Sequence, residues 1–121
     1  MKIKIKESKK YGRGVFATDN IIFGEVIEIS DLIILSKLEA EHIDKTSLYN
    51  YYFSWNEDIA IALGYGSLYN HSYQPNAVYI KKISERCLEF VALKDIKKGE
   101  EIFVNYNENP NDKSELWFET K

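Results

Sequence analysis

The sequence predicts one domain built mainly from β-strands with short helices, and three observations support this fold class. The chain has 121 residues, a length that suits a single domain. Short runs rich in Ile, Val, Phe and Tyr recur along it and are separated by turn-forming residues, a pattern typical of strands. Signals for helices are confined to short stretches. We therefore expect residues 1–121 to form one mainly β domain with short helices.

The individual elements follow from local patterns. Ile3 and Ile5 alternate with lysines, and a glycine turn at residues 12–14 separates them from the apolar pair at 15–16, so two strands are expected there. Residues 36–39 read S-K-L-E, a capping box that predicts a short helix over residues 37–42. A second helical turn is predicted within residues 47–53. Further strands are predicted at residues 25–29, 32–35, 77–81, 88–93 and 101–106.

Composition and charge exclude several classes of protein. The longest uninterrupted apolar stretches, residues 32–35 and 59–63, fall far short of the roughly 20 residues that cross a bilayer. The single cysteine, Cys87, and two widely separated histidines provide no disulfide and no metal-ligand spacing, so we expect no metal. A net charge of -3 gives no general attraction to nucleic acid. Because the N-terminus lacks the pattern of a signal peptide, we expect an intracellular protein, cytoplasmic in a bacterium or in the host nucleus if viral.

The glycine segment could bind a ligand. Residues 12–17 match the dinucleotide-binding pattern G-x-G-x-x-A, but a lysine-rich segment precedes them and a polar turn follows, so the strand and helix that this pattern requires are missing. A plain hairpin turn and a backbone that closely approaches a ligand both remain open.

Two other features concentrate polar and aromatic groups. Residues 70–76 contain Asn70, His71, Ser72, Pro75 and Asn76, directly after an apolar run, which favours either a hydrogen-bonded bend or a ligand pocket. The N-x-S pattern at 70–72 is not interpreted as a glycosylation site because no secretory signal is present. The chain also has nine tyrosines, which suit either a core or the wall of a narrow channel that orients an amine.

Three segments together resemble a known family. Y-G-R-G-V-F-A at 11–17, L-Y-N-H-S-Y-Q-P-N at 68–76 and G-E-E-I-F-V-N-Y at 99–106 are similar, in this order, to the principal motifs of SET-domain protein lysine methyltransferases. The chain differs from the frequent family pattern at Ser67 and Asn105, where an arginine and an acidic residue often occur. In size it resembles a minimal SET domain of the viral or bacterial type. The resemblance implies small β-sheets with a C-terminal pseudoknot, in which the Tyr106 segment threads beside the Asn70-His71 segment.

The resemblance also implies an activity and its site. The activity is methyl transfer from S-adenosylmethionine to a neutral lysine amine of a protein, with S-adenosylhomocysteine as the product. The backbone at Arg13 and Gly14 would cradle the donor, and Asn70 and His71 would hold its amino acid part and adenine. A SET-like module that binds a cofactor or a partner without turnover is the alternative.

Further roles are implied for aromatic residues and for the tail. Tyr106 would be the catalytic tyrosine and would also contact the donor, with Tyr51 as the second tyrosine of the lysine channel. Tyr65 and Val104 would complete this channel, and Val104 is less bulky than the aromatic residues often found at its position, which predicts room for di- or trimethyl-lysine. Within a C-terminal tail at 107–121, Trp117 or Phe118 would stack on the adenine and close the pocket.

The implied substrate is a lysine-containing protein, with histone tails and other basic tails as candidates. A free lysine amine has a pKa of about 10.4, so the channel must favour the neutral form that can attack. Apolar walls achieve this by desolvation, and the positive sulfonium of the donor adds repulsion. The many aromatic residues are also compatible with a homodimer.

Overall fold

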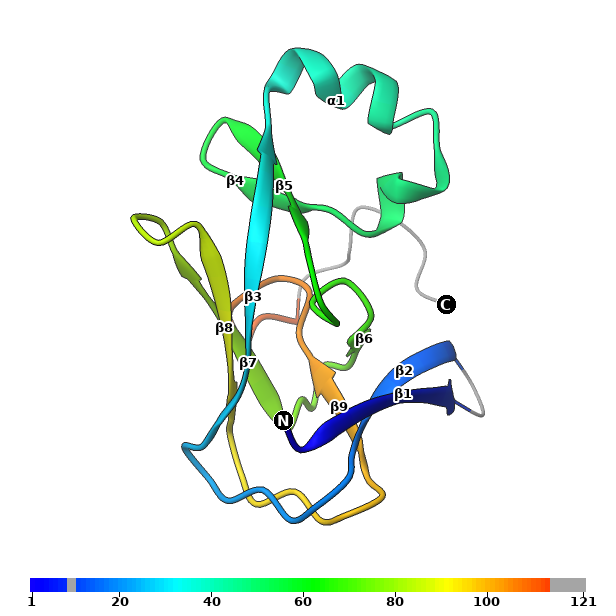
Figure 1. Cartoon of the computed structure of the whole chain (residues 1–121), viewed down its shortest axis with the longest axis vertical. Helices are drawn as coiled ribbons and strands as arrows, with labels where there is room; N and C mark the ends of the chain where they lie inside the picture. Colours follow the sequence, from blue (N-terminus) through cyan, green and yellow to red (C-terminus); the bar gives the residue numbers. More distant parts are fainter. Residues whose placement is uncertain (9–10, 114–121) are drawn as a thin grey trace.

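A computed structural model describes residues 1–8 and 11–113 of the chain and shows mainly β-structure, as predicted (Figure 1). The first sheet begins with a hairpin in which β1 (Ile3–Ser8) pairs antiparallel with β2 (Gly12–Ala17). Because Gly12 already pairs with Ser8, the glycine segment is the start of strand β2, and our prediction of a glycine turn was wrong. β2 pairs with β9 (Glu101–Val104), and β9 pairs with β6 (Asn70–His71), which gives the order β1-β2-β9-β6.

A second sheet has the strand order β4-β5-β3-β8-β7. Its central strand is β3 (Val26–Leu35), which we had predicted as two strands. The two parts are continuous because Ser30 and Asp31 between them pair with Leu88 and Cys87. The other strands are β4 (Phe53–Trp55), β5 (Asp58–Ala62), β7 (Ala77–Lys82) and β8 (Cys87–Ala92).

Two short helices lie between β3 and β4, at the end of the molecule away from the N-terminal hairpin (Figure 1). α1 (Lys37–Ile43) starts at the predicted capping box, in which the Glu39 carboxylate accepts from the Ser36 N–H at 2.7 Å. The 3-10 helix η1 (Ser47–Asn50) follows. The second helical turn is shorter than predicted because Phe53 pairs with Ala60 in the β4–β5 ladder. Among the described residues, no helix is both long and apolar enough to cross a membrane.

The hydrophobic core lies between the two sheets and is contributed by most of the strands. Residues that are completely shielded from solvent come from β2, β5, β7, β8 and β9, namely Val15, Ala60, Ala77, Leu88, Phe90 and Ile102. The ring of Tyr69, in the segment before β6, stacks on Phe90 with ring centroids 4.1 Å apart. The core therefore fixes the position of the chain that leads into β6.

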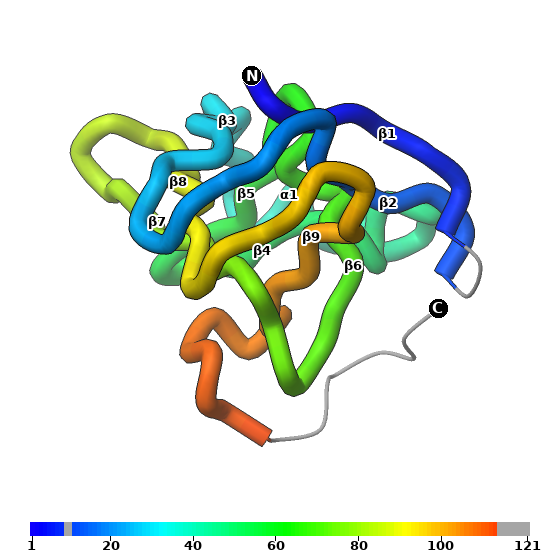
Figure 2. Tube along the Cα trace, turned by 90° about the horizontal axis from the view of Figure 1, so that it is seen from below, coloured from blue at the N-terminus to red at the C-terminus, as the bar shows by residue number. Residues whose placement is uncertain are grey.

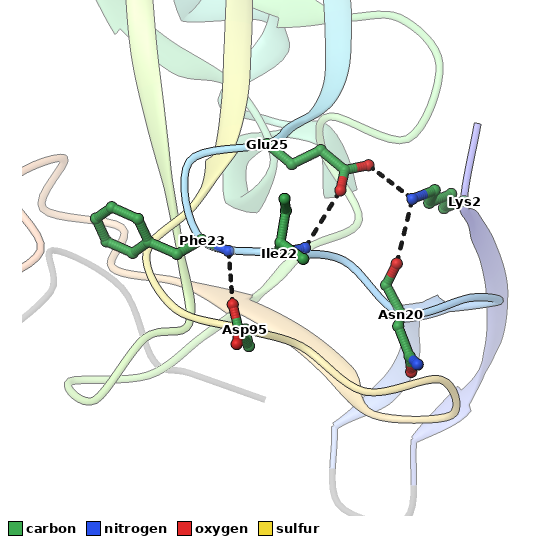
Figure 3. Close-up of polar contacts among 6 residues, drawn as sticks. All are labelled: Lys2, Asn20, Ile22, Phe23, Glu25 and Asp95. Carbon is green, nitrogen blue, oxygen red and sulfur yellow. Dashed lines mark hydrogen bonds and ion pairs between the residues drawn. The ribbon is translucent and has the colours of Figure 1, made fainter.

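The base of the molecule is formed by residues 18–25 and 93–100. Ile21 and Ile96 form an isolated antiparallel bridge between these segments. Figure 3 shows polar side-chain contacts in this region, and these contacts are exposed. The Glu25 carboxylate accepts from the Ile22 N–H at 3.2 Å and lies 3.0 Å from the Lys2 ammonium, while the Asp95 carboxylate accepts from the Phe23 N–H at 2.8 Å.

Candidate functional site

Two strands from distant parts of the sequence meet at the centre of the candidate site. β6 and β9 run parallel, with Asn70 opposite Phe103 and His71 opposite Val104. After β9 the chain continues beside the loop that follows β6, and Figure 2 shows the two segments crossing. The Tyr106 N–H donates to His71 Nδ1 at 3.0 Å. The structure therefore places the Tyr106 segment beside the Asn70-His71 segment, as the resemblance implied.

The side chain of Asn70 joins three strands. It is 4% exposed, and its Nδ2 donates to the Arg13 carbonyl at 3.2 Å and to Glu101 Oε2 at 2.7 Å. These bonds pass over Gly14, where a Cβ atom would lie 2.3 Å from Glu101 Oε2 and 2.7 Å from Asn70 Nδ2. Gly14 thus leaves the space in which the Asn70 and Glu101 side chains bond to each other. The predicted residues Arg13, Gly14 and Asn70 are brought together.

Two residues that we assigned no role support this junction. Asn76 donates from Nδ2 to the Glu101 carbonyl at 2.9 Å and accepts at Oδ1 from the Phe103 N–H at 2.8 Å. It therefore provides hydrogen-bonding partners for the main chain of β9. Both Asn76 and Glu101 lie inside the motifs that carried the resemblance, and Asn76 also belongs to the polar cluster at residues 70–76.

His71 presents one nitrogen to the protein and leaves the other without a partner. Because Nδ1 accepts the Tyr106 N–H, the proton of a neutral ring is on Nε2. Nε2 is buried and has no hydrogen-bond partner within the described part of the chain. Burial lowers the pKa of His71, which favours the neutral ring. A buried N–H donor without a partner suits a polar group of a ligand.

Tyr106 is held at both its backbone and its hydroxyl. The hydroxyl donates to the Tyr69 carbonyl at 2.5 Å, and the Tyr106 carbonyl accepts from the Tyr79 hydroxyl at 3.0 Å. Burial raises the pKa of Tyr106, and the neighbouring Tyr51 and Glu101 raise it further. The phenol therefore stays protonated at neutral pH and is a hydrogen-bonding group rather than a base.

Tyr106 also lines a pocket of about 630 Å³, its open mouth included, and His71 is not among the described residues that line it. Tyr51, Val104 and Tyr106, which we predicted to line a lysine channel, all lie in the wall of this pocket. Tyr65, which we also predicted in the channel, is not among the described residues that line the pocket. Aromatic side chains dominate the lining, which consists of Asn50, Tyr51, Tyr52, Phe53, Ser54, Gly66, Ser67, Tyr69, Tyr79, Val104 and Tyr106.

Two other predictions concern the tail and metals. Trp117 and Phe118, proposed to close the cofactor pocket, lie outside the described residues. Within residues 1–8 and 11–113, no group of three or more His, Cys, Asp or Glu side chains is placed to hold a metal ion.

Comparison with known proteins identifies the family. Residues 12–107 match the SET domain, and the chain belongs to this family of protein lysine methyltransferases, which use S-adenosylmethionine as the methyl donor. The chain is 35% identical over 119 residues to a histone H3 lysine-37 specific N-methyltransferase of Schizosaccharomyces pombe, covering 97% of this chain and 77% of the relative.

Two Plasmodium falciparum proteins are also similar. The variant-silencing SET domain-containing protein is 37% identical over 122 residues, and the match covers 88% of this chain but only 5% of that much longer protein. The crystal structure of a candidate histone methyltransferase superposes with a TM-score of 0.73 at 33% identity, covering 87% of this chain and 92% of the other. The chain is thus a lysine methyltransferase by family, and its fold is that of a SET domain.

Proposed function

We propose that the chain transfers a methyl group from S-adenosylmethionine directly to a lysine amine of a basic protein tail. The observation that carries this proposal is the position of Tyr106. Its backbone N–H binds His71 in the junction of β2, β6 and β9, while its ring lines the aromatic pocket. Tyr106 thus lies between a polar site, which we assign to the methyl donor, and an aromatic channel of a kind that suits a lysine side chain.

The residues on the donor side fit the cofactor. Among the described residues, the buried His71 Nε2–H has no hydrogen-bond partner, and the preceding residue, Asn70, binds the Arg13 carbonyl. In this proposal His71 and Asn70 hold the polar groups of S-adenosylmethionine, which supplies a methyl group on a positive sulfonium. Trp117 or Phe118 would close this side, as an aromatic residue from the tail.

The aromatic pocket favours the neutral form of the lysine amine, which is the form that can attack. Tyr51, Tyr79 and Tyr106 form much of an aromatic wall that desolvates the substrate and so favours the neutral lysine. The Tyr106 hydroxyl donates its only proton to the Tyr69 carbonyl. Toward other groups its oxygen therefore acts as a hydrogen-bond acceptor. The nitrogen–carbon bond forms as the carbon–sulfur bond breaks, and no covalent enzyme intermediate is needed. Holding the reacting groups in line is worth about 7–11 kcal/mol in well-oriented systems.

The pocket wall also bears on the number of methyl groups transferred. Val104 is 1% exposed and lies in the wall with Tyr106, and Tyr65 is not among the described residues of that wall. We propose that the channel accepts methylated lysine and that the enzyme proceeds to di- or trimethyl-lysine. Mass spectrometry after a long reaction with excess donor tests this, and exclusive accumulation of monomethyl-lysine would contradict it.

The substrate class is proposed from charge and from the relatives. Several acidic residues line the groove beside α1 that adjoins the pocket at Tyr52 and Ser54, including Glu41, Asp44 and Glu57. Acidic side chains favour a substrate rich in lysine and arginine. Because the S. pombe relative is named for histone H3, we propose histone H3 as the first substrate to test and an intracellular site of action.

The test is methyl incorporation from labelled S-adenosylmethionine into histone H3 and into a mixture of other basic proteins. We expect labelled lysine in at least one of them, and at least about 10²-fold slower labelling in a reaction with the Tyr106→Phe variant. Calorimetric titration with S-adenosylhomocysteine is run in parallel. Cofactor binding with no transfer to any substrate would contradict the proposal and identify a non-catalytic binding module.

A further inference from the structure

The carboxyl group of Glu28 lies in the interior of the molecule. In a regular strand successive side chains alternate between the two faces, but the β3–β8 register shifts between Val26 and Glu28. As a result Ile27 and Glu28, which are neighbours in sequence, are both buried, with 6% and 4% exposure. A β-bulge of this kind re-aims a side chain. Here it directs a carboxylate into the core, which is costly unless the group is fully hydrogen-bonded.

Both oxygens of this carboxylate are bound by the segment that leads into β6. Oε1 accepts from the Tyr69 hydroxyl at 2.7 Å, and Oε2 accepts from the Tyr65 N–H at 2.9 Å. The segment also closes tightly around Glu28. Gly64 has a φ of 65° and a Cβ atom on it would lie 2.5 Å from Oε2, so only glycine suits this turn. The conformation of residues 64–69 is thus adapted to the buried carboxylate.

Tyr69 connects Glu28 to the candidate catalytic tyrosine. Its ring is 1% exposed and is fixed between the Glu28 carboxylate and the face of Phe90, and burial with the nearby Glu28 raises its pKa, so it remains a donor. Its main-chain carbonyl accepts the Tyr106 hydroxyl at 2.5 Å. Three hydrogen-bonding groups are therefore in series, from Glu28 through Tyr69 to the hydroxyl of Tyr106.

We infer that Glu28 is a positioning residue for methyl transfer, which acts through Tyr69 to orient the hydroxyl of Tyr106. This inference rests on the proposed function. A phenol has one proton, and the acceptor of that proton decides where the oxygen lone pairs point. With the Tyr69 carbonyl held in place, the Tyr106 oxygen faces a fixed direction. Glu28 is not among the described residues that line the pocket, so its effect should fall on turnover and not on binding.

Two substitutions of Glu28 distinguish the effect of losing its charge from the effect of losing its hydrogen bonds. Glu28→Leu fills a similar volume but removes both acceptors, and we expect kcat to fall about tenfold or more with the peptide KM and the Kd for S-adenosylhomocysteine changed by less than about twofold. Glu28→Gln should keep most of the activity, because its amide oxygen can accept from the Tyr65 N–H while its amide nitrogen donates to the Tyr69 hydroxyl. Glu89→Leu, on the adjacent strand opposite Ile29, is the matched control and should leave kcat unchanged.

The inference fails if Glu28→Leu keeps the kcat of the natural sequence, or if it weakens both affinities as much as it lowers kcat. Should Glu28→Leu not fold, Tyr69→Phe decides the question, because it removes only the hydroxyl that binds Glu28. We expect a severalfold lower kcat at unchanged KM, and an unchanged kcat overturns the inference. If the natural sequence transfers no methyl group to any substrate, the proposed function itself is wrong, and this inference falls with it.

Discussion

The site and the base of the molecule are both held by side-chain hydrogen bonds, but in different surroundings. At the junction of β6 and β9 the bonding groups are buried, with Asn70 at 4% and Asn105 at 1% exposure. At the base, the Lys2 and Glu25 side chains that form an ion pair are 45% and 28% exposed (Figure 3). Water can replace a lost partner at the base but not at the junction. We therefore expect the loss of a side-chain hydrogen bond to destabilise the protein strongly at the junction and only weakly at the base.

The largest effect is expected at Tyr106. Tyr106→Phe keeps the ring in the pocket wall and removes the hydroxyl that binds the Tyr69 carbonyl. We expect methyl transfer to fall by at least about 10²-fold, which corresponds to about 2.7 kcal/mol, while the protein stays folded. Single-turnover assays with labelled donor measure the rate, and circular dichroism checks the fold. Full activity of this variant would show that Tyr106 is not catalytic.

The next effect is expected at Gly14. In Gly14→Ala the new Cβ would overlap Glu101 Oε2 and Asn70 Nδ2, so the Asn70–Glu101 hydrogen bond must open. We expect the affinity for S-adenosylhomocysteine to fall about tenfold and the melting temperature to drop by several degrees. Calorimetric titration and thermal unfolding measure the two quantities.

The matched control for Gly14→Ala is Gly12→Asn on the same strand. Gly12 has a φ of 78°, and a Cβ atom on it would meet no other atom within 4 Å. Asn tolerates this backbone conformation better than most residues. We expect near-normal affinity. Equal loss of affinity in both variants would show that close packing at Gly14 has no special role.

Several strands could be predicted from sequence because their signals are local. The capping box at Ser36 and the β-rich runs at residues 77–81 and 88–93 are set by neighbouring residues, and the structure confirms them as the start of α1 and as β7 and β8. Strands β4, β5 and β6 were not predicted. The errors arose where distant partners decide the outcome. Pairing with β8 joins residues 25–29 and 32–35 into β3, and pairing with β1 makes a strand of the glycine segment.

The site could be predicted in part, and through the motifs alone. Asn70, His71 and Tyr106 lie together, as the resemblance implied, although their roles remain predictions. Glu28 could not be found, because a bulge turns it inward and its partners lie 37 and 41 residues away. Tyr65 was placed in the channel because it belongs to a cluster of tyrosines, but that clustering does not determine which way each ring points.

A smaller effect, on the melting temperature, is expected from the protonation of His71 at low pH. Burial lowers its pKa in the folded protein below the ordinary value of 6.5, so the unfolded chain takes up a proton first as the pH falls. The contribution of His71 to stability is therefore complete above about pH 6.5 and decreases below it. We expect the melting temperature to fall between about pH 7.5 and about pH 5.5, and less so in His71→Gln, whose amide oxygen can still accept the Tyr106 N–H. His42→Gln, at an exposed position of α1, is the control and should keep the full pH dependence.

The smallest effect is expected at the base. Lys2→Met removes the ammonium that lies 3.0 Å from Glu25 and donates to the Asn20 carbonyl at 3.2 Å. Because these groups are exposed, water replaces the lost contacts, and the freed side chains regain conformational entropy. We expect a change in melting temperature of no more than about 1 °C and unchanged methyl transfer. Thermal unfolding of Lys2→Met is measured in parallel with that of Asn70→Ala, which removes the buried hydrogen bonds to Arg13 and Glu101. The two melting temperatures then compare the two regions directly. A loss for Lys2→Met as large as that for Asn70→Ala would show that burial does not separate the two regions.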